Sequence, residues 1–151
     1  DFEERFYVAT EWITTKVKSS EDSDLMAAHL RLKTYCKKHN DAGYNIPVDT
    51  WPVRITVADD GLSLSWFVPP GTKMPENTDP SVTQESRAEA TVYVLAFSDR
   101  PSIKSGQEHA EYLREALDKA GKTFNPHSYD GVGYDSFLSV TFHNEIWMYA
   151  A

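Results

Sequence analysis

The same order of predicted secondary-structure elements occurs twice along this chain, on either side of a proline-rich segment. Apolar spacing predicts strand, helix, strand and strand in each half. The first set covers 2–17, 23–40, 51–57 and 62–68, and the second covers 90–97, 103–120, 128–134 and 138–149. Residues 69–87, with four prolines, are predicted as an exposed connection. We therefore expect one α+β domain over 1–151, with two βαββ repeats (about 1–70 and 87–151) forming a distorted β-barrel flanked by two α-helices.

The first predicted helix, 23–40, carries a histidine within its apolar stripe. Four residues recur at the spacing of a single helical face: Leu25, His29, Leu32 and Cys36. Met26 and Lys33 lie on the shoulder of that face. Ser23 is the predicted N-cap of this helix.

His29 has two interpretations. It can be a core or boundary histidine whose ring nitrogens have ordinary partners. It can also face a ligand bound along this helix, with Lys33 one turn further on. The helix sequence alone leaves both interpretations open.

The second predicted helix, 103–120, has recognisable signals at both ends. Ser105 and Glu108 have the spacing of a capping box, and Gly121 is the predicted stop. Each predicted helix has one apolar stripe and one charged face, which is typical of helices that cover the outside of a sheet.

Composition excludes several classes of protein. The net charge of -8 argues against a nucleic-acid surface, and no apolar run approaches the roughly 18 residues of a membrane span. A single cysteine, Cys36, excludes an intrachain disulfide. The chain starts at Asp1 without an initiator methionine or an apolar leader, so we expect that upstream residues were removed, and we favour a cytoplasmic over a secreted location.

Several short motifs, in order, resemble the SOUL/heme-binding protein family over essentially the whole chain. The most specific are the Asn144-Glu145-Ile146-Trp147 ending and the Pro52-Val53 pair that follows Thr50 by two residues. The others are Phe2-Glu3-Glu4-Arg5-Phe6-Tyr7, Ala9-Thr10-Glu11-Trp12, the Tyr35–Asn40 helix end, Arg87-Ala88-Glu89-Ala90-Thr91-Val92-Tyr93-Val94 and Gly133-Tyr134-Asp135-Ser136. The resemblance implies two βαββ repeats and a non-covalent tetrapyrrole site beside the first helix.

The chain also departs from the family pattern. In one branch a first-strand histidine is a proposed axial heme ligand, and the matching residue here is Phe6, which cannot bind iron. In the other branch the resemblance implies an apolar groove between the first helix and nearby loops, with helix positions that fall on Met26 and His29 and a tyrosine that falls on Tyr134. Asp49 stands where the family has a methionine, and Trp51 stands where it has a small residue. We therefore expect the mouth of the groove to differ from that of either branch.

A porphyrin-like ligand needs an apolar face, cations for its carboxylates and, for tight iron binding, an axial nitrogen or sulfur. Six residues are the candidate binding set: Leu25, Met26, His29, Lys33, Arg54 and Tyr134. Among them Lys33 and Arg54 are the cations, and His29 is the candidate metal ligand. We expect binding or transport of heme or another tetrapyrrole, without nucleic acid as a partner.

An enzyme is not expected, because no catalytic motif is present and the carboxylates are predicted on solvated faces. Two alternatives to tetrapyrrole binding remain. The resemblance implies a cell-death modulator as one alternative, with a protein partner held through residues 113–118, although Leu113 and Leu117 also fit a buried helix stripe. The other alternative is a binder of small hydrophobic ligands that has lost heme binding.

Overall fold

A computed structural model describes residues 2–48, 50–76, 79–98, 102–134 and 142–151. Its eight strands form one antiparallel sheet with the order β1-β6-β8-β7-β3-β4-β2-β5. The strands are β1 Glu3–Tyr7, β2 Thr10–Val17, β3 Val53–Ala58, β4 Gly61–Val68, β5 Thr83–Arg87, β6 Ala90–Phe97, β7 Ser128–Gly133 and β8 Asn144–Tyr149. The helices are α1 Asp22–Asp41 and α2 Ile103–Lys119.

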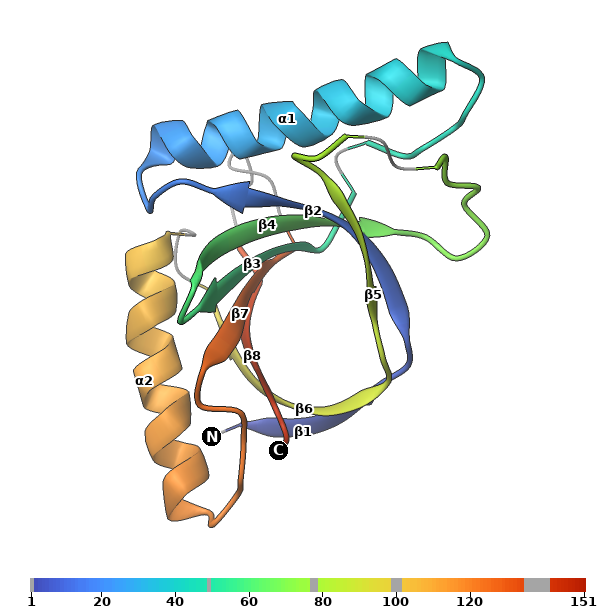
Figure 1. Ribbon diagram of the computed structural model, residues 1–151. Coiled ribbons are helices and arrows are strands. Elements are labelled where there is room, and N and C mark those ends of the chain that lie inside the picture. The colour runs from blue at the N-terminus through green and yellow to red at the C-terminus, as the bar shows by residue number, and fades with distance from the viewer. Residues whose placement is uncertain (1, 49, 77–78, 99–101, 135–141) are drawn as a thin grey trace.

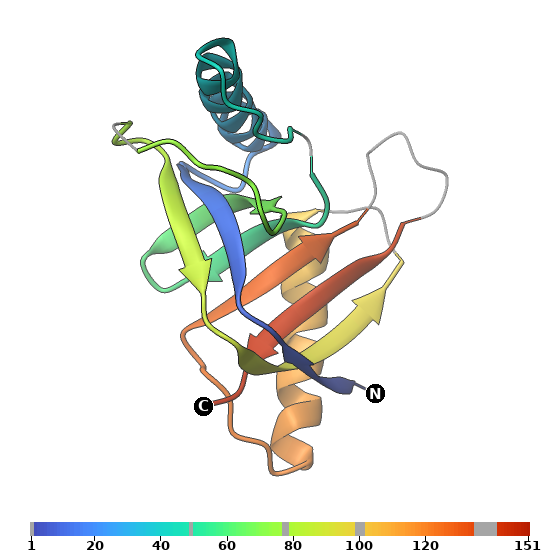
Figure 2. The ribbon, with the colours of Figure 1, turned by 90° about the vertical axis from the view of Figure 1, so that its right-hand side faces the viewer.

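The sheet curls into a half-barrel, and the two helices lie outside it (Figure 1). Strand pairing has an internal symmetry: β1 pairs with β6 and β5 pairs with β2, while β3 and β7 pair at the centre. In Figure 2 the two helices cover separate parts of the outer surface. The predicted α+β class, with two helices flanking a curled antiparallel sheet, is confirmed.

Two predicted elements were wrong. The single strand over 2–17 is two strands, because β1 pairs with β6 whereas β2 pairs with β4 and β5. The predicted connection over 69–87 ends in strand β5, an edge strand whose polar sequence gave no strand signal. Each half therefore has the order strand, strand, helix, strand, strand. Part of the predicted last strand, 138–141, lies outside the described residues.

The helices lie close to the predicted ranges but begin differently. α1 starts one residue earlier, with Glu21 as an N-cap that makes no side-chain cap hydrogen bond, so Ser23 is not the cap. At α2 the cap is Ser102, whose Oγ accepts from the Ser105 backbone N–H, in place of the predicted Ser105–Glu108 box. Gly121 follows α2 with a positive φ of 69°, which favours glycine.

Each helix packs on the outer face of the sheet through its own apolar cluster. Beneath α1, Leu32 and Cys36 of the predicted stripe are fully buried, and so is the neighbouring Ala28. Beneath α2, Leu113 and Leu117 are fully buried. No helix within the described ranges is long and apolar enough to cross a membrane.

The inner face of the curl has an apolar cluster of its own and also carries buried charged residues. Its apolar part consists mainly of Trp12, Val92, Val94, Val132 and Trp147. Its buried charged residues alternate along their strands with residues that face the helices, and they are Arg54 on β3, Asp130 on β7 and Glu145 on β8. The outer and inner faces therefore offer chemically different surfaces to a ligand.

Candidate functional site

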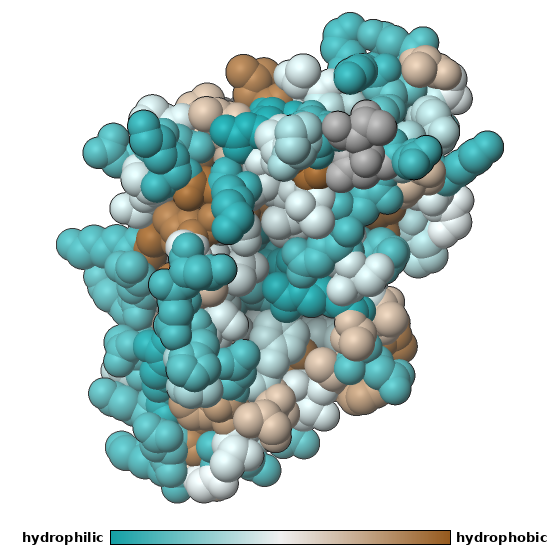
Figure 3. Space-filling view, viewed as in Figure 1, coloured by the Kyte–Doolittle hydropathy of each residue, from teal (hydrophilic) through white to brown (hydrophobic). Residues whose placement is uncertain are grey.

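The exposed side of α1 combines apolar and basic side chains. Met26 is 71% exposed and Leu30 is 63% exposed, four residues apart on the same side of the helix. Lys33 is exposed one turn beyond His29, and His29 is half-buried at the edge of this surface. Apolar atoms reach the surface over α1 in Figure 3, at the top of the view. We call Met26, His29, Leu30 and Lys33 the α1 face.

A hydrogen bond to the sheet holds the His29 ring. Trp66 Nε1 donates to His29 Nδ1 at 3.2 Å, and the two ring centroids lie 6.1 Å apart. Trp66 is 1% exposed in β4, where its backbone pairs with Ile13 and Val53. Leu25 is half-buried and packs against the same apolar cluster. The structure thus brings Leu25, Met26, His29 and Lys33 together on α1.

Arg54 does not belong to that group. Along β3, Val53 and Ile55 pack against the cluster under α1, so Arg54 between them points into the curl. Its guanidinium is buried and lies over the Trp12 ring, 4.3 Å from the centroid. Arg54 Nη2 donates to Ser65 Oγ at 3.0 Å and to both Glu85 oxygens at 3.1 Å.

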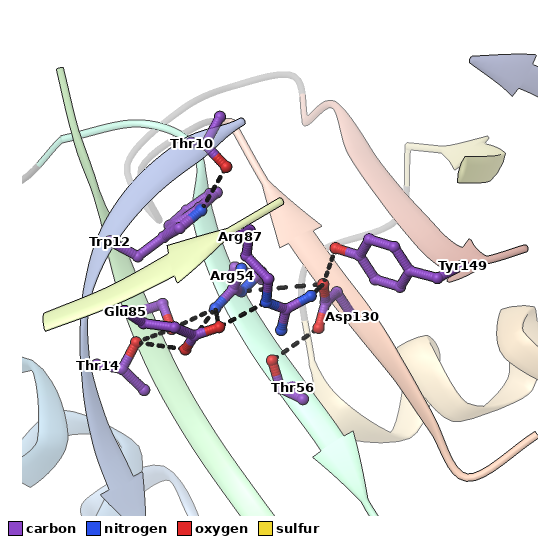
Figure 4. A network of polar contacts seen from close by, with 10 residues as sticks. Thr10, Trp12, Thr14, Arg54, Thr56, Glu85, Arg87, Asp130 and Tyr149 are labelled. Atoms are coloured by element: carbon purple, nitrogen blue, oxygen red, sulfur yellow. Dashed lines mark hydrogen bonds and ion pairs between the residues drawn. The ribbon is translucent and has the colours of Figure 1, made fainter. Parts of the chain in front are cut away.

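The inner network around Arg54 continues across the curl, as Figure 4 shows. Arg87 on β5 lies between two carboxylates, donating to Glu85 Oε2 at 2.5 Å and to Asp130 Oδ2 at 3.4 Å. Asp130 also accepts from Thr56 at 2.7 Å and from Tyr149 at 2.5 Å. The network therefore joins edge strand β5 to β3, β7 and β8.

Burial and charge act in opposite directions on the pKa values in this network. Burial tends to raise the pKa of Glu85, but the hydrogen bond from Arg87 and the charges of both arginines outweigh it, so that pKa lies below its usual range. Burial and the neighbouring Asp130 raise the pKa of Tyr149. Glu85 is therefore a charged partner of the arginines at neutral pH, and Tyr149 is a neutral donor.

Tyr134 belongs to a second inner network, centred on Glu145. Its hydroxyl donates to Glu145 Oε1 at 3.3 Å, and its ring lies 5.3 Å from that of His143. Glu145 is 2% exposed and accepts from Arg5 at 3.1 Å and from Trp147 at 2.8 Å. Burial alone would raise the pKa of Glu145, but the hydrogen bonds from Trp147 and His143 and the charge of Arg5 lower it.

Sequence reasoning missed both inner networks because it placed the carboxylates on solvated faces. Asp130 and Glu145 are in fact almost fully buried, and for Glu145 the signal was local: it directly precedes the apolar run from Ile146 to Met148. Within the described ranges, no three histidine, cysteine or acidic residues gather in a way that could hold a metal ion. Among the described residues, the α1 face has exposed apolar side chains beside a cation, whereas the charged residues inside the curl are buried.

Comparison with known proteins relates the chain to heme-binding proteins. The chain is 28% identical to Heme-binding protein 2 of Homo sapiens and, separately, to that of Mus musculus, over 97% of this chain and 77% of each relative. A cryo-EM structure of an EcmrR–DNA complex has a similar fold, with a TM-score of 0.74 and 11% identity. That match covers 98% of this chain and 56% of the other. The SOUL heme-binding protein profile matches residues 1–149, and the chain therefore belongs to the SOUL heme-binding protein family.

Proposed function

We propose that this protein binds heme or a related tetrapyrrole non-covalently on the α1 face, as a binding protein rather than an enzyme. Membership of the SOUL heme-binding family supports the ligand class. The observation that carries the location is the exposure of Met26 and Leu30 beside His29 and Lys33 on one helix. Exposed apolar side chains that adjoin polar groups are a frequent feature of ligand-binding surfaces.

The chemistry of the α1 face fits the parts of a tetrapyrrole. Met26 and Leu30 would cover part of the flat apolar ring, and the Lys33 ammonium would pair with a carboxylate at its edge. Arg54 cannot reach such a ligand, because it lies buried on the other face of the sheet. That His29 binds the iron stays a prediction, and it requires the hydrogen bond from Trp66 to break or rearrange.

Titration with hemin tests the proposal, followed by Soret absorbance and tryptophan fluorescence. Trp66 adjoins the α1 face, so saturable quenching at 1:1 stoichiometry is expected. Leu30→Asp should weaken binding roughly tenfold or more, since burying one such side chain contributes about 1.5–3 kcal/mol. Tyr112→Asp is the matched control, because Tyr112 is 74% exposed on α2 and should leave affinity unchanged.

Lys33→Ala should also weaken hemin binding, without moving the Soret maximum, because an ammonium pairs with a carboxylate and not with iron. Lys37→Ala, one turn further along α1 and paired with Asp41 at 3.6 Å, controls for the loss of a charge. Equal affinities for Leu30→Asp, Tyr112→Asp and the unmodified protein would place the ligand elsewhere.

The alternative of a protein partner held by residues 113–118 has less structural support. Leu113 and Leu117 are fully buried against the sheet beneath α2. A groove that accepted these leucines would first have to displace α2 from its own cluster. Capture of a partner only after α2 is destabilised would favour this alternative.

A further inference from the structure

The edge strand β1 exposes large apolar side chains at the margin of the sheet. It pairs only with β6, so one of its backbone edges has no partner strand in the part of the chain that the structure describes (Figure 1). Arg5 reaches Glu145 inside the curl, so the alternation of side chains places Phe6, and Val8 directly after the strand, on the outer side. Phe6 is 63% exposed and Val8 is 70% exposed. This margin therefore combines unpaired backbone groups with apolar side chains in water.

The corresponding margin at the other edge strand, β5, is polar. β1 and β2 begin at residues 3 and 10, and β5 and β6 begin 80 residues later, at 83 and 90. Phe6 and Val8 thus correspond to Ser86 and Ala88, and the Ser86 hydroxyl donates to Glu11 at 2.8 Å. The second repeat forms its edge strand without large apolar side chains at these positions, so the fold alone does not account for Phe6 and Val8.

We propose that β1 pairs in antiparallel fashion with β1 of a second copy of this chain, in a two-fold symmetric dimer whose sheet continues from one copy into the other. An edge strand can accept another strand because the N–H and C=O groups on its free side have no partner. A two-fold axis makes the contact isologous, so each β1 offers the other the same surface. The inference goes beyond the proposed function and does not rest on the α1 face.

Charge selects the register of this pairing. Directly opposite residues of neighbouring strands point to the same side of a sheet, so the two-fold axis must pass through a residue that faces its own copy. An axis at Glu3, Glu4 or Arg5 would place like charges opposite each other, which is destabilising. An axis at Tyr7 would leave only Tyr7 opposite the second β1. An axis at Phe6 avoids both faults, because Phe6 faces its own copy and Arg5 faces Tyr7.

The dimer should be weak and should strengthen with salt. β1 has only five residues, and small interfaces are typical of transient complexes. Each copy carries a net charge of -8, so two copies repel each other at long range. Salt screens this repulsion, because the Debye length falls from about 30 Å at 0.01 M to about 8 Å at 0.15 M. Sedimentation velocity from micromolar to millimolar protein should show a reversible monomer–dimer equilibrium whose dimer fraction rises with salt.

Oxidative cross-linking tests the register. Phe6→Cys would place two thiols opposite each other, with Cα atoms about 4.5–5.5 Å apart, which a disulfide can span. Val8→Cys is the matched control: Val8 is similarly exposed but would face Glu4 of the second copy, so its two thiols would lie about 13 Å apart along the strands. Phe6→Cys should cross-link and Val8→Cys should not. The native Cys36 is fully buried, and the unmodified protein measures its background.

Opposite charges at the axis give a second test. Phe6→Glu and Phe6→Lys should each weaken dimerisation roughly tenfold or more, because an apolar pair is replaced by two like charges. An equimolar mixture of the two variants should recover the dimer, since opposite charges then face each other. Ser86→Glu, at the corresponding position on β5, should leave the equilibrium unchanged. Phe6 is mostly exposed, so each variant should fold, and circular dichroism checks that it does.

Three results would overturn the inference. The first is a monomer at every protein and salt concentration, and the second is equal cross-linking of Phe6→Cys and Val8→Cys. The third is a dimer that persists in Phe6→Glu, which would mean that two copies associate through another surface. Hemin titration is a separate measurement, so the failure of the dimer and the failure of the proposed function are distinguishable.

Discussion

Asp130→Ala tests whether the inner charged network holds the curled sheet together. Asp130 is 1% exposed and accepts hydrogen bonds from Thr56 and Tyr149. It also lies 3.4 Å from Arg87 Nη1 and 3.9 Å from Arg54 Nε. Removing the carboxylate would leave the buried Arg54 with Glu85 as its remaining acidic partner.

The size of the effect follows from this geometry. Breaking a buried ion pair by removing one partner costs about 3–5 kcal/mol, because the other charge stays buried. Arg54 and Arg87 both keep Glu85, and the Arg87 side chain is 28% exposed, so the lower end applies. We expect a loss of about 3 kcal/mol in the free energy of unfolding, or roughly 6–12 °C in Tm for a chain of this length.

Urea denaturation monitored by tryptophan fluorescence measures this loss as a lower midpoint at an unchanged m value. Asp59→Ala is the matched control: Asp59 lies 2.6 Å from His127, but both side chains are 74% exposed. Its cost should stay below about 1 kcal/mol. If Asp130→Ala were no more harmful than this control, the network would not be what ties β5 to the rest of the sheet.

Two further variants test the core and the second network. Leu32→Ala, at a fully buried position under α1, should cost about 2–5 kcal/mol in urea denaturation, whereas Leu30→Ala on the exposed side should change stability by less than about 0.5 kcal/mol; similar losses would contradict the packing described. The folded-state pKa of Glu145 is lowered, so its charge stabilises the fold above the usual glutamate pKa, and this contribution is lost as pH falls through the lowered value. The stability difference between the unmodified protein and Glu145→Gln should therefore be largest near neutral pH and narrow below about pH 4, and a pH-independent difference would refute this.

The sequence predicted those parts of the fold whose signals are local. The apolar stripe of 23–40 located α1 to within one residue at each end, because helical spacing is a property of the segment itself. β1 and β5 are five-residue edge strands with mostly exposed side chains. Their existence depends on pairing with β6 and β2, which are distant in sequence, so apolar spacing could not separate β1 from β2 or find β5.

The same distinction applies to the candidate residues. Met26, His29 and Lys33 share a surface because one helix carries them. Arg54 was grouped with them, although the alternation with Val53 and Ile55 already placed it on the opposite face of its strand. The partners of Arg54 lie on strands that only the folded sheet brings close, and so does the Trp66 indole that fixes the His29 ring.

The inner networks also bear on where a flat ligand can bind. Inside the curl, Trp12, Arg54 and Asp130 are each at most 3% exposed, and the charges there are already paired. A macrocycle placed inside would have to separate those ion pairs and displace packed aromatic rings, at a cost of several kcal/mol for each pair broken. On the α1 face, Met26 and Leu30 are exposed to water before any ligand arrives, so covering them breaks no ion pair and removes apolar surface from water. We therefore expect ligand binding outside the sheet, and hemin should bind Asp130→Ala as tightly as the unmodified protein under conditions in which both are folded.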